Sequence, residues 1–127
     1  MRSFLLPVAA AIVVLGLGIA YADDMPALTG KSDSGPVLTD KKMMTLYTFD
    51  KDADGKSMCN GPCATNWPPL MAPADAKMNG SWSPVTRDDG SKQWAYKGKP
   101  LYTWVKDTKP GDTTGDAVGN VWHTARP

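Results

Sequence analysis

Two cysteines and one histidine are the side chains of this sequence best suited to binding a soft metal ion or exchanging electrons. Cys59 and Cys63 flank an Asn-Gly-Pro turn, and His123 is the single histidine of the chain. Two thiolates and an imidazole suit Cu(I), and Met58 adds a thioether directly before Cys59. These four residues define one hypothesis, a copper-handling or thiol-redox site.

The same cysteines also fit a simpler interpretation, a disulfide that closes a short loop. Thiols this close across a Gly-Pro turn pair readily in an oxidising compartment, and the chain-entropy estimate for so small a loop is about 2 kcal/mol. A reactive dithiol would need a helix N-terminus or a cation to lower the thiol pKa, and Lys56 is the one cation nearby in the sequence. We therefore expect a structural Cys59–Cys63 disulfide and no cofactor, with copper as the alternative.

A third pattern is an incomplete calcium loop. Asp50, Asp52 and Asp54 alternate before Gly55, as carboxylates do in the first half of a calcium-binding loop. The position that should carry a bidentate glutamate is Gly61. The pattern therefore predicts at most a weak calcium site, and an aspartate-rich turn is the simpler interpretation.

Enzymatic activity and nucleic-acid binding have little support in the sequence. The single histidine has no identifiable nucleophile partner, and no G-x-S-x-G elbow is present. The formal net charge is +1, so no basic surface is predicted that would attract nucleic acid. We expect a non-enzymatic binding or envelope-associated module whose partner is an unknown ligand or envelope protein.

The N-terminal segment, residues 1–22, predicts export. Arg2 precedes an apolar run from Phe4 to Ile19, and Ala20-Tyr21-Ala22 forms an A-x-A cleavage site. Cleavage near Ala22 would remove the only long apolar stretch and leave no transmembrane segment. No cysteine stands directly after the small residues that end this run to carry a lipid, so we expect a periplasmic or secreted protein.

The rest of the chain predicts a small, turn-rich, all-β domain with antiparallel strands and little helix. Eleven prolines, twelve glycines and the lack of glutamate disfavour long helices. Residues 23–35 are polar and lack periodicity, so we expect a flexible leader there and a domain at 36–127. Short segments of strand character recur through that domain, at residues 36–40, 43–49, 82–86, 92–97, 101–105 and 121–124.

The domain contains an internal repeat with an offset of 55 residues. Leu46-Tyr47-Thr48-Phe49 aligns with Leu101-Tyr102-Thr103-Trp104, and Trp67 aligns with Trp122. The first copy spans about 36–72 and the second about 91–127. Residues used alike in both halves are expected to build the scaffold, and they are Tyr47, Phe49, Asp52, Trp67, Tyr102, Trp104, Asp107 and Trp122.

These repeated residues carry a resemblance to a known family. The chain resembles bacterial secreted-repeat proteins and predicted lipoproteins with a Tyr-x-aromatic-x-x-Asp motif, here Tyr47 to Asp52 and Tyr102 to Asp107. The similarity continues through Cys59 and Cys63, through the Trp67-Pro-Pro-Leu segment and to the end of the chain. It implies an exported two-repeat domain and assigns no activity.

Overall fold

The protein is an all-β module in which two sequence-related halves share one body. The computed structural model describes residues 25–53 and 55–127, and both the predicted signal peptide and Asp54 lie outside them. The described elements, in chain order, are β1 (Leu28–Ser32), β2 (Gly35–Thr39), β3 (Tyr47–Phe49), α2 (Pro62–Asn66), β4 (Met71–Ala72), β5 (Trp82–Thr86), β6 (Lys92–Tyr96), β7 (Lys99–Pro100), the 3-10 turn η1 (Val118–Asn120) and β8 (Trp122–Thr124). Strands predominate and the helical pieces are short, which confirms the predicted fold class.

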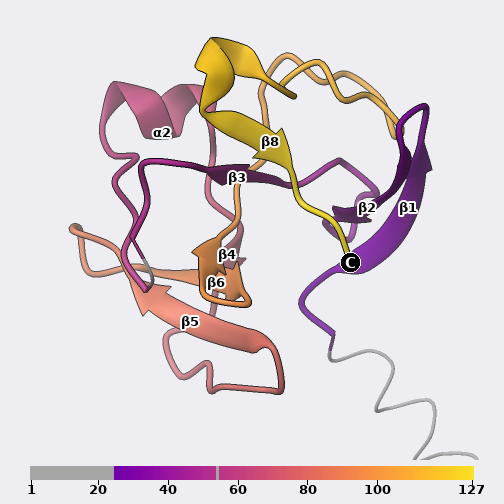
Figure 1. Ribbon diagram of the computed structural model, residues 1–127. Helices are drawn as coiled ribbons and strands as arrows, with labels where there is room; N and C mark the ends of the chain where they lie inside the picture. Colours follow the sequence, from indigo (N-terminus) through magenta and orange to yellow (C-terminus); the bar gives the residue numbers. More distant parts are fainter. Residues whose placement is uncertain (1–24, 54) are drawn as a thin grey trace, which may run out of the picture.

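The strands form three small antiparallel sheets. β1 pairs with β2, β3 pairs with β8, and β4, β6 and β5 form a third sheet in which β7 also pairs with β6. In Figure 1 the β3–β8 pair crosses the upper part of the molecule, with the β1–β2 hairpin at one end and the third sheet below. No described helix is long and apolar enough to span a membrane.

The β1–β2 hairpin corrects the expected start of the domain. Residues 28–32, predicted as part of a flexible leader, form β1 and pair in register with β2 from Leu28↔Thr39 to Ser32↔Gly35. Ala27, just before the strand, is buried in the core. The sequence pattern hid this strand because Gly30 is the one residue of β1 that is buried, and glycine gives no apolar signal. A Cβ at Gly30 would lie 2.7 Å from the Thr39 side chain, so the close approach requires glycine here.

The two halves are interleaved rather than placed side by side. β3 of the first repeat pairs with β8 at the end of the second, and Tyr102 of the second repeat bridges Pro69 near the end of the first. Tyr47 and Tyr102 meet between the halves, where the amide of each donates to the carbonyl of the other at 2.7 and 3.0 Å. Each half therefore completes its strand pairing with residues of the other.

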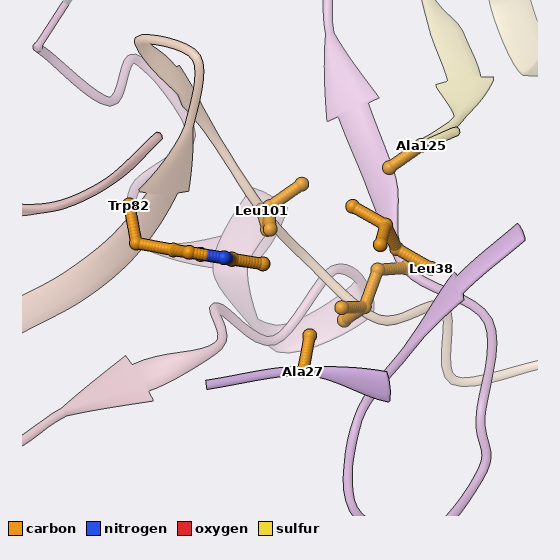
Figure 2. Close-up of a cluster of buried hydrophobic side chains, with 6 residues drawn as sticks. Ala27, Leu38, Trp82, Leu101 and Ala125 are labelled. Atoms are coloured by element: carbon orange, nitrogen blue, oxygen red, sulfur yellow. The ribbon is translucent and has the colours of Figure 1, made fainter. Parts of the chain in front are cut away.

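Two buried clusters stabilise this arrangement. One gathers residues from both halves, and its labelled side chains point toward one another in Figure 2; its members are Ala27, Leu38, Leu46, Trp82, Leu101 and Ala125. The other lies under the repeat motifs and contains Tyr47, Cys59, Trp67, Tyr102 and Trp122. Burial of such large aromatic side chains is worth roughly 1.5–3 kcal/mol each, which makes a core of this kind sufficient for a small domain.

Candidate functional site

The tyrosines and aspartates of the repeat motif bind each other across the two halves. The Tyr47 hydroxyl donates to Asp107 at 2.6 Å, and the Tyr102 hydroxyl donates to Asp52 at 2.7 Å. Burial, reinforced by these carboxylates, raises the pKa of both tyrosines well above the ordinary value. Burial also raises the pKa of Asp52, against the hydrogen bonds from the Met58 amide and from Tyr102. Tyr47, Tyr102 and Asp107 are buried and Asp52 is partly buried, and their mutual hydrogen bonds across the halves assign them to the scaffold.

The motif aromatics form a continuous stack through the same region. The Trp67 and Trp122 rings lie 3.7 Å apart and nearly parallel, and they join the two repeats at the centre of the stack. Trp104 stacks on Trp67 at 3.9 Å, and Phe49 stacks on Trp122 at 4.2 Å. The stack accounts for the large rings at matching positions of both repeats as packing groups.

Cys59 and Cys63 form a disulfide, which confirms the prediction. Cys59 is fully buried against the aromatic cluster, and the buried Arg87 side chain donates to its carbonyl oxygen at 2.7 Å. Arg87 also donates to the hydroxyl of Ser57 and to the side-chain oxygen of Gln93. Arg87, which follows β5, thus fixes the loop that the disulfide closes in the first repeat.

The copper hypothesis required His123 to lie beside Cys59 and Cys63, and the structure does not place it there. Trp122 and Thr124 of β8 point into the protein, so His123 between them points outward, away from the cluster that contains Cys59. Its Nε2 lies 2.8 Å from the Asp50 carboxylate. Met58 remains in the cysteine loop and is half exposed. Within the described residues, no three histidine, cysteine or carboxylate side chains are grouped as metal ligands.

The carboxylates of the proposed calcium loop also point in different directions. Asp50 pairs with His123 on the surface, whereas Asp52 turns inward to Tyr102 and to the Met58 amide. Asp54 lies outside the described residues. The two described carboxylates therefore serve separate contacts instead of one shared ion position.

The exposed Asp50–His123 pair lies in a groove of about 320 Å³ between β8 and the β6–β7 turn. The groove is rich in cations, with Lys97 and Lys99 from the turn and Arg126 from the C-terminal segment. Its other lining residues are Thr48, Tyr96, Leu101, Thr124 and Ala125. A smaller hollow of about 110 Å³ adjoins it through Thr48, Asp50 and Lys99. The groove thus combines carboxylate, imidazole, ammonium and guanidinium groups in one depression.

Local structure holds two of the cations in place. Lys97 and Gly98 form the two-residue turn between β6 and β7, and both have positive φ, 52° and 84°. A lysine at such a position is uncommon, because asparagine and glycine adopt it with less strain. The Arg126 guanidinium is anchored by the backbone oxygens of Ser34 and Pro36, each at 2.9 Å, and by the Ser34 hydroxyl.

A second groove, about 460 Å³ in volume, occupies the related position in the other half. It is lined by Met25, Pro26, Asp40, Lys41, Lys42, Leu70, Met71, Pro73 and Trp94. With the 55-residue offset, Met71 takes the place of Arg126, and Leu70 takes the place of Ala125. Val105 and Pro68 occupy the sequence positions that correspond to Asp50 and His123, and neither lines this second groove. The scaffold is therefore shared, while the carboxylate–imidazole pair belongs to one groove alone.

Sequence reasoning found parts of this site without assembling them. Asp50 and His123 were assigned to separate metal hypotheses, and Lys97, Lys99 and Arg126 were not singled out. A signal was present, because comparison of the two copies shows polar residues in one that are replaced by valine, proline and methionine in the other. The strand pairing that sets Asp50 beside His123 could not be read from that comparison.

The fold and its reciprocal contacts define a two-repeat β module. Residues 28–71 and 83–126 each match a family described as a secreted repeat of unknown function, and the chain belongs to that family. Both matched segments are offset by the 55 residues found in the sequence, which confirms the resemblance and the two-repeat organisation. No curated protein and no solved structure matches the chain.

Proposed function

We propose that the protein is an exported, non-enzymatic binding or envelope-associated module, and that its ligand enters the groove containing Asp50 and His123. One observation carries this proposal: two equivalent grooves share a scaffold, and only one of them contains the carboxylate–imidazole pair. Packing explains features common to both halves, but it does not require polar groups specific to one. The family description as a secreted repeat supports action outside the cytoplasm.

The surroundings of His123 favour binding over catalysis. Nucleophilic catalysis needs a hydroxyl or thiol within hydrogen-bond reach of the base. In the described part of the chain, the hydrogen-bond partner of His123 is the Asp50 carboxylate, and the cysteines are joined as a disulfide. Tyr47, Asp107 and Tyr102 are buried beneath the strands, and the partly buried Asp52 is held by the Tyr102 hydroxyl and the Met58 amide. The groove can hold a molecule by charge and hydrogen bonds.

Thermal unfolding with a compound panel tests this proposal. The mature protein would be mixed separately with neutral sugars, sugar phosphates, sugar acids, amino acids and dicarboxylates, because a ligand that binds the folded state raises the unfolding midpoint. We expect at least one compound to raise the midpoint, and His123→Ala and Asp50→Asn to abolish the effect. Pro68→Ala and Val105→Ala, at the equivalent positions, should retain it. A panel without any effect, or an effect that survives both groove variants, would overturn the proposal.

A further inference from the structure

We infer that this groove binds a small molecule carrying a phosphate or carboxylate group, an inference that rests on the proposed function. The groove contains three permanent cations, Lys97, Lys99 and Arg126, and one carboxylate, Asp50. The carboxylate already has a partner, since it lies 2.8 Å from His123. Among the described residues, none of the three cations forms an ion pair with a carboxylate. Their charge is therefore available to an anion.

Two of the cations, Arg126 and Lys97, are held in position before a ligand arrives. Arg126 is anchored only by neutral oxygens, so it keeps its charge uncompensated while losing side-chain freedom. Lys97 lies over the ring of Tyr96 at 5.1 Å, on a turn whose backbone is unfavourable for lysine. Ordering these groups in the free protein reduces the entropy lost on binding.

The size and lining of the groove limit the ligand further. A volume of about 320 Å³ is at the lower end of the range for small-molecule pockets, which suits a molecule the size of a hexose phosphate or a sugar acid. Leu101 and Ala125 form an apolar floor, while Asp50 and Thr48 offer oxygen atoms to ligand hydroxyls. The ligand class is thus a small polyhydroxylated anion.

The equivalent groove supplies an internal control. It also has two lysines, Lys41 and Lys42, but Met71 replaces Arg126 and Asp40 lies beside the lysines. The Asp40 carboxylate accepts hydrogen bonds from the Lys42 and Met44 amides, which hold it beside the lysines of that groove. Anions should therefore prefer the groove that contains Arg126.

Isothermal calorimetry at low ionic strength, with glucose 6-phosphate, gluconate and glucose as probes, tests the inference. We expect glucose 6-phosphate or gluconate to bind and glucose to show no measurable binding. Lys97→Asn with Lys99→Gln should weaken binding by about tenfold, because two exposed charge contacts are lost. Asparagine suits the positive φ at position 97, so the fold is retained. Added salt should weaken binding further through screening.

The matched control is Lys41→Gln with Lys42→Gln, which removes the same charge from the equivalent groove and should leave the affinity within about twofold. Equal weakening by both double variants, or failure of both anions to bind, would overturn the inference. If glucose binds as tightly as the anions, and His123→Ala abolishes that binding, the inference is also overturned. The proposed function would still stand in that case. If no compound of the panel binds in the groove, both the inference and the proposed function are overturned.

Discussion

The hydroxyl of Tyr47 donates a 2.6 Å hydrogen bond to the carboxylate of Asp107, a residue from the other repeat. The reciprocal contact joins Tyr102 to Asp52 at 2.7 Å. The tyrosine and the aspartate of each motif are thus not partners within one repeat but each bind the matching residue of the other. The tyrosine and aspartate of the motif therefore stabilise the contact between the two copies.

Replacing Tyr47 with phenylalanine should reduce the free energy of unfolding by about 1–3 kcal/mol, because it removes a donor and leaves the buried Asp107 carboxylate with one hydrogen bond fewer. Equilibrium urea unfolding would measure the change. Tyr96→Phe is the matched control, since Tyr96 is half-buried and should change stability by less than about 0.5 kcal/mol. Equal effects of the two substitutions would contradict the assignment of Tyr47 as a bridge between repeats.

Neither repeat should fold alone. β3 lacks its partner β8 when the second half is absent, and Tyr102 lacks Pro69 when the first is absent. Residues 25–72 and 82–127, produced separately, should each give a disordered circular dichroism spectrum, and mixing them should restore β structure. A cooperative unfolding transition from either half by itself would refute the interleaved arrangement.

Alkaline pH should destabilise the protein through Tyr47 and Tyr102. Burial raises the pKa of both tyrosines in the folded state, whereas an unfolded tyrosine ionises near pH 10. The folded state therefore binds more protons above that pH, and stability falls as pH rises. Urea midpoints should decline from about pH 10 upward, with a smaller decline in Tyr47→Phe. An identical decline in that variant would argue against this cause.

Removing the disulfide should affect stability without affecting the groove. Cys59→Ala with Cys63→Ala frees a short loop, so the free energy of unfolding should fall by about 2 kcal/mol from chain entropy, with a further loss from the buried Cys59 sulfur. Compounds that raise the unfolding midpoint of the unmodified protein should raise that of the variant by a similar amount. Loss of their effect in the variant would connect the cysteine loop to binding.

The sequence was most informative where residue types recur with a period. Alternation and turn residues identified β5 and β6, and the 55-residue offset identified the two repeats. β1 was missed because its one buried residue is a glycine. The exchange of partners between repeats could not be predicted, because internal similarity is the same whether Tyr47 binds Asp52 or Asp107. The groove that contains Asp50 and His123 depends on this long-range pairing, so it could not be predicted from the sequence either.

Chemical-shift mapping distinguishes the groove that contains Asp50 and His123 from the groove that contains Lys42 and Met71 as the binding site. Backbone amide signals of the mature protein would be followed while adding the panel compound that most raises the unfolding midpoint. We expect shifts concentrated at Lys99, His123 and their neighbours. Shifts concentrated at Lys42 and Met71 in the equivalent groove, or spread evenly over the protein, would contradict it.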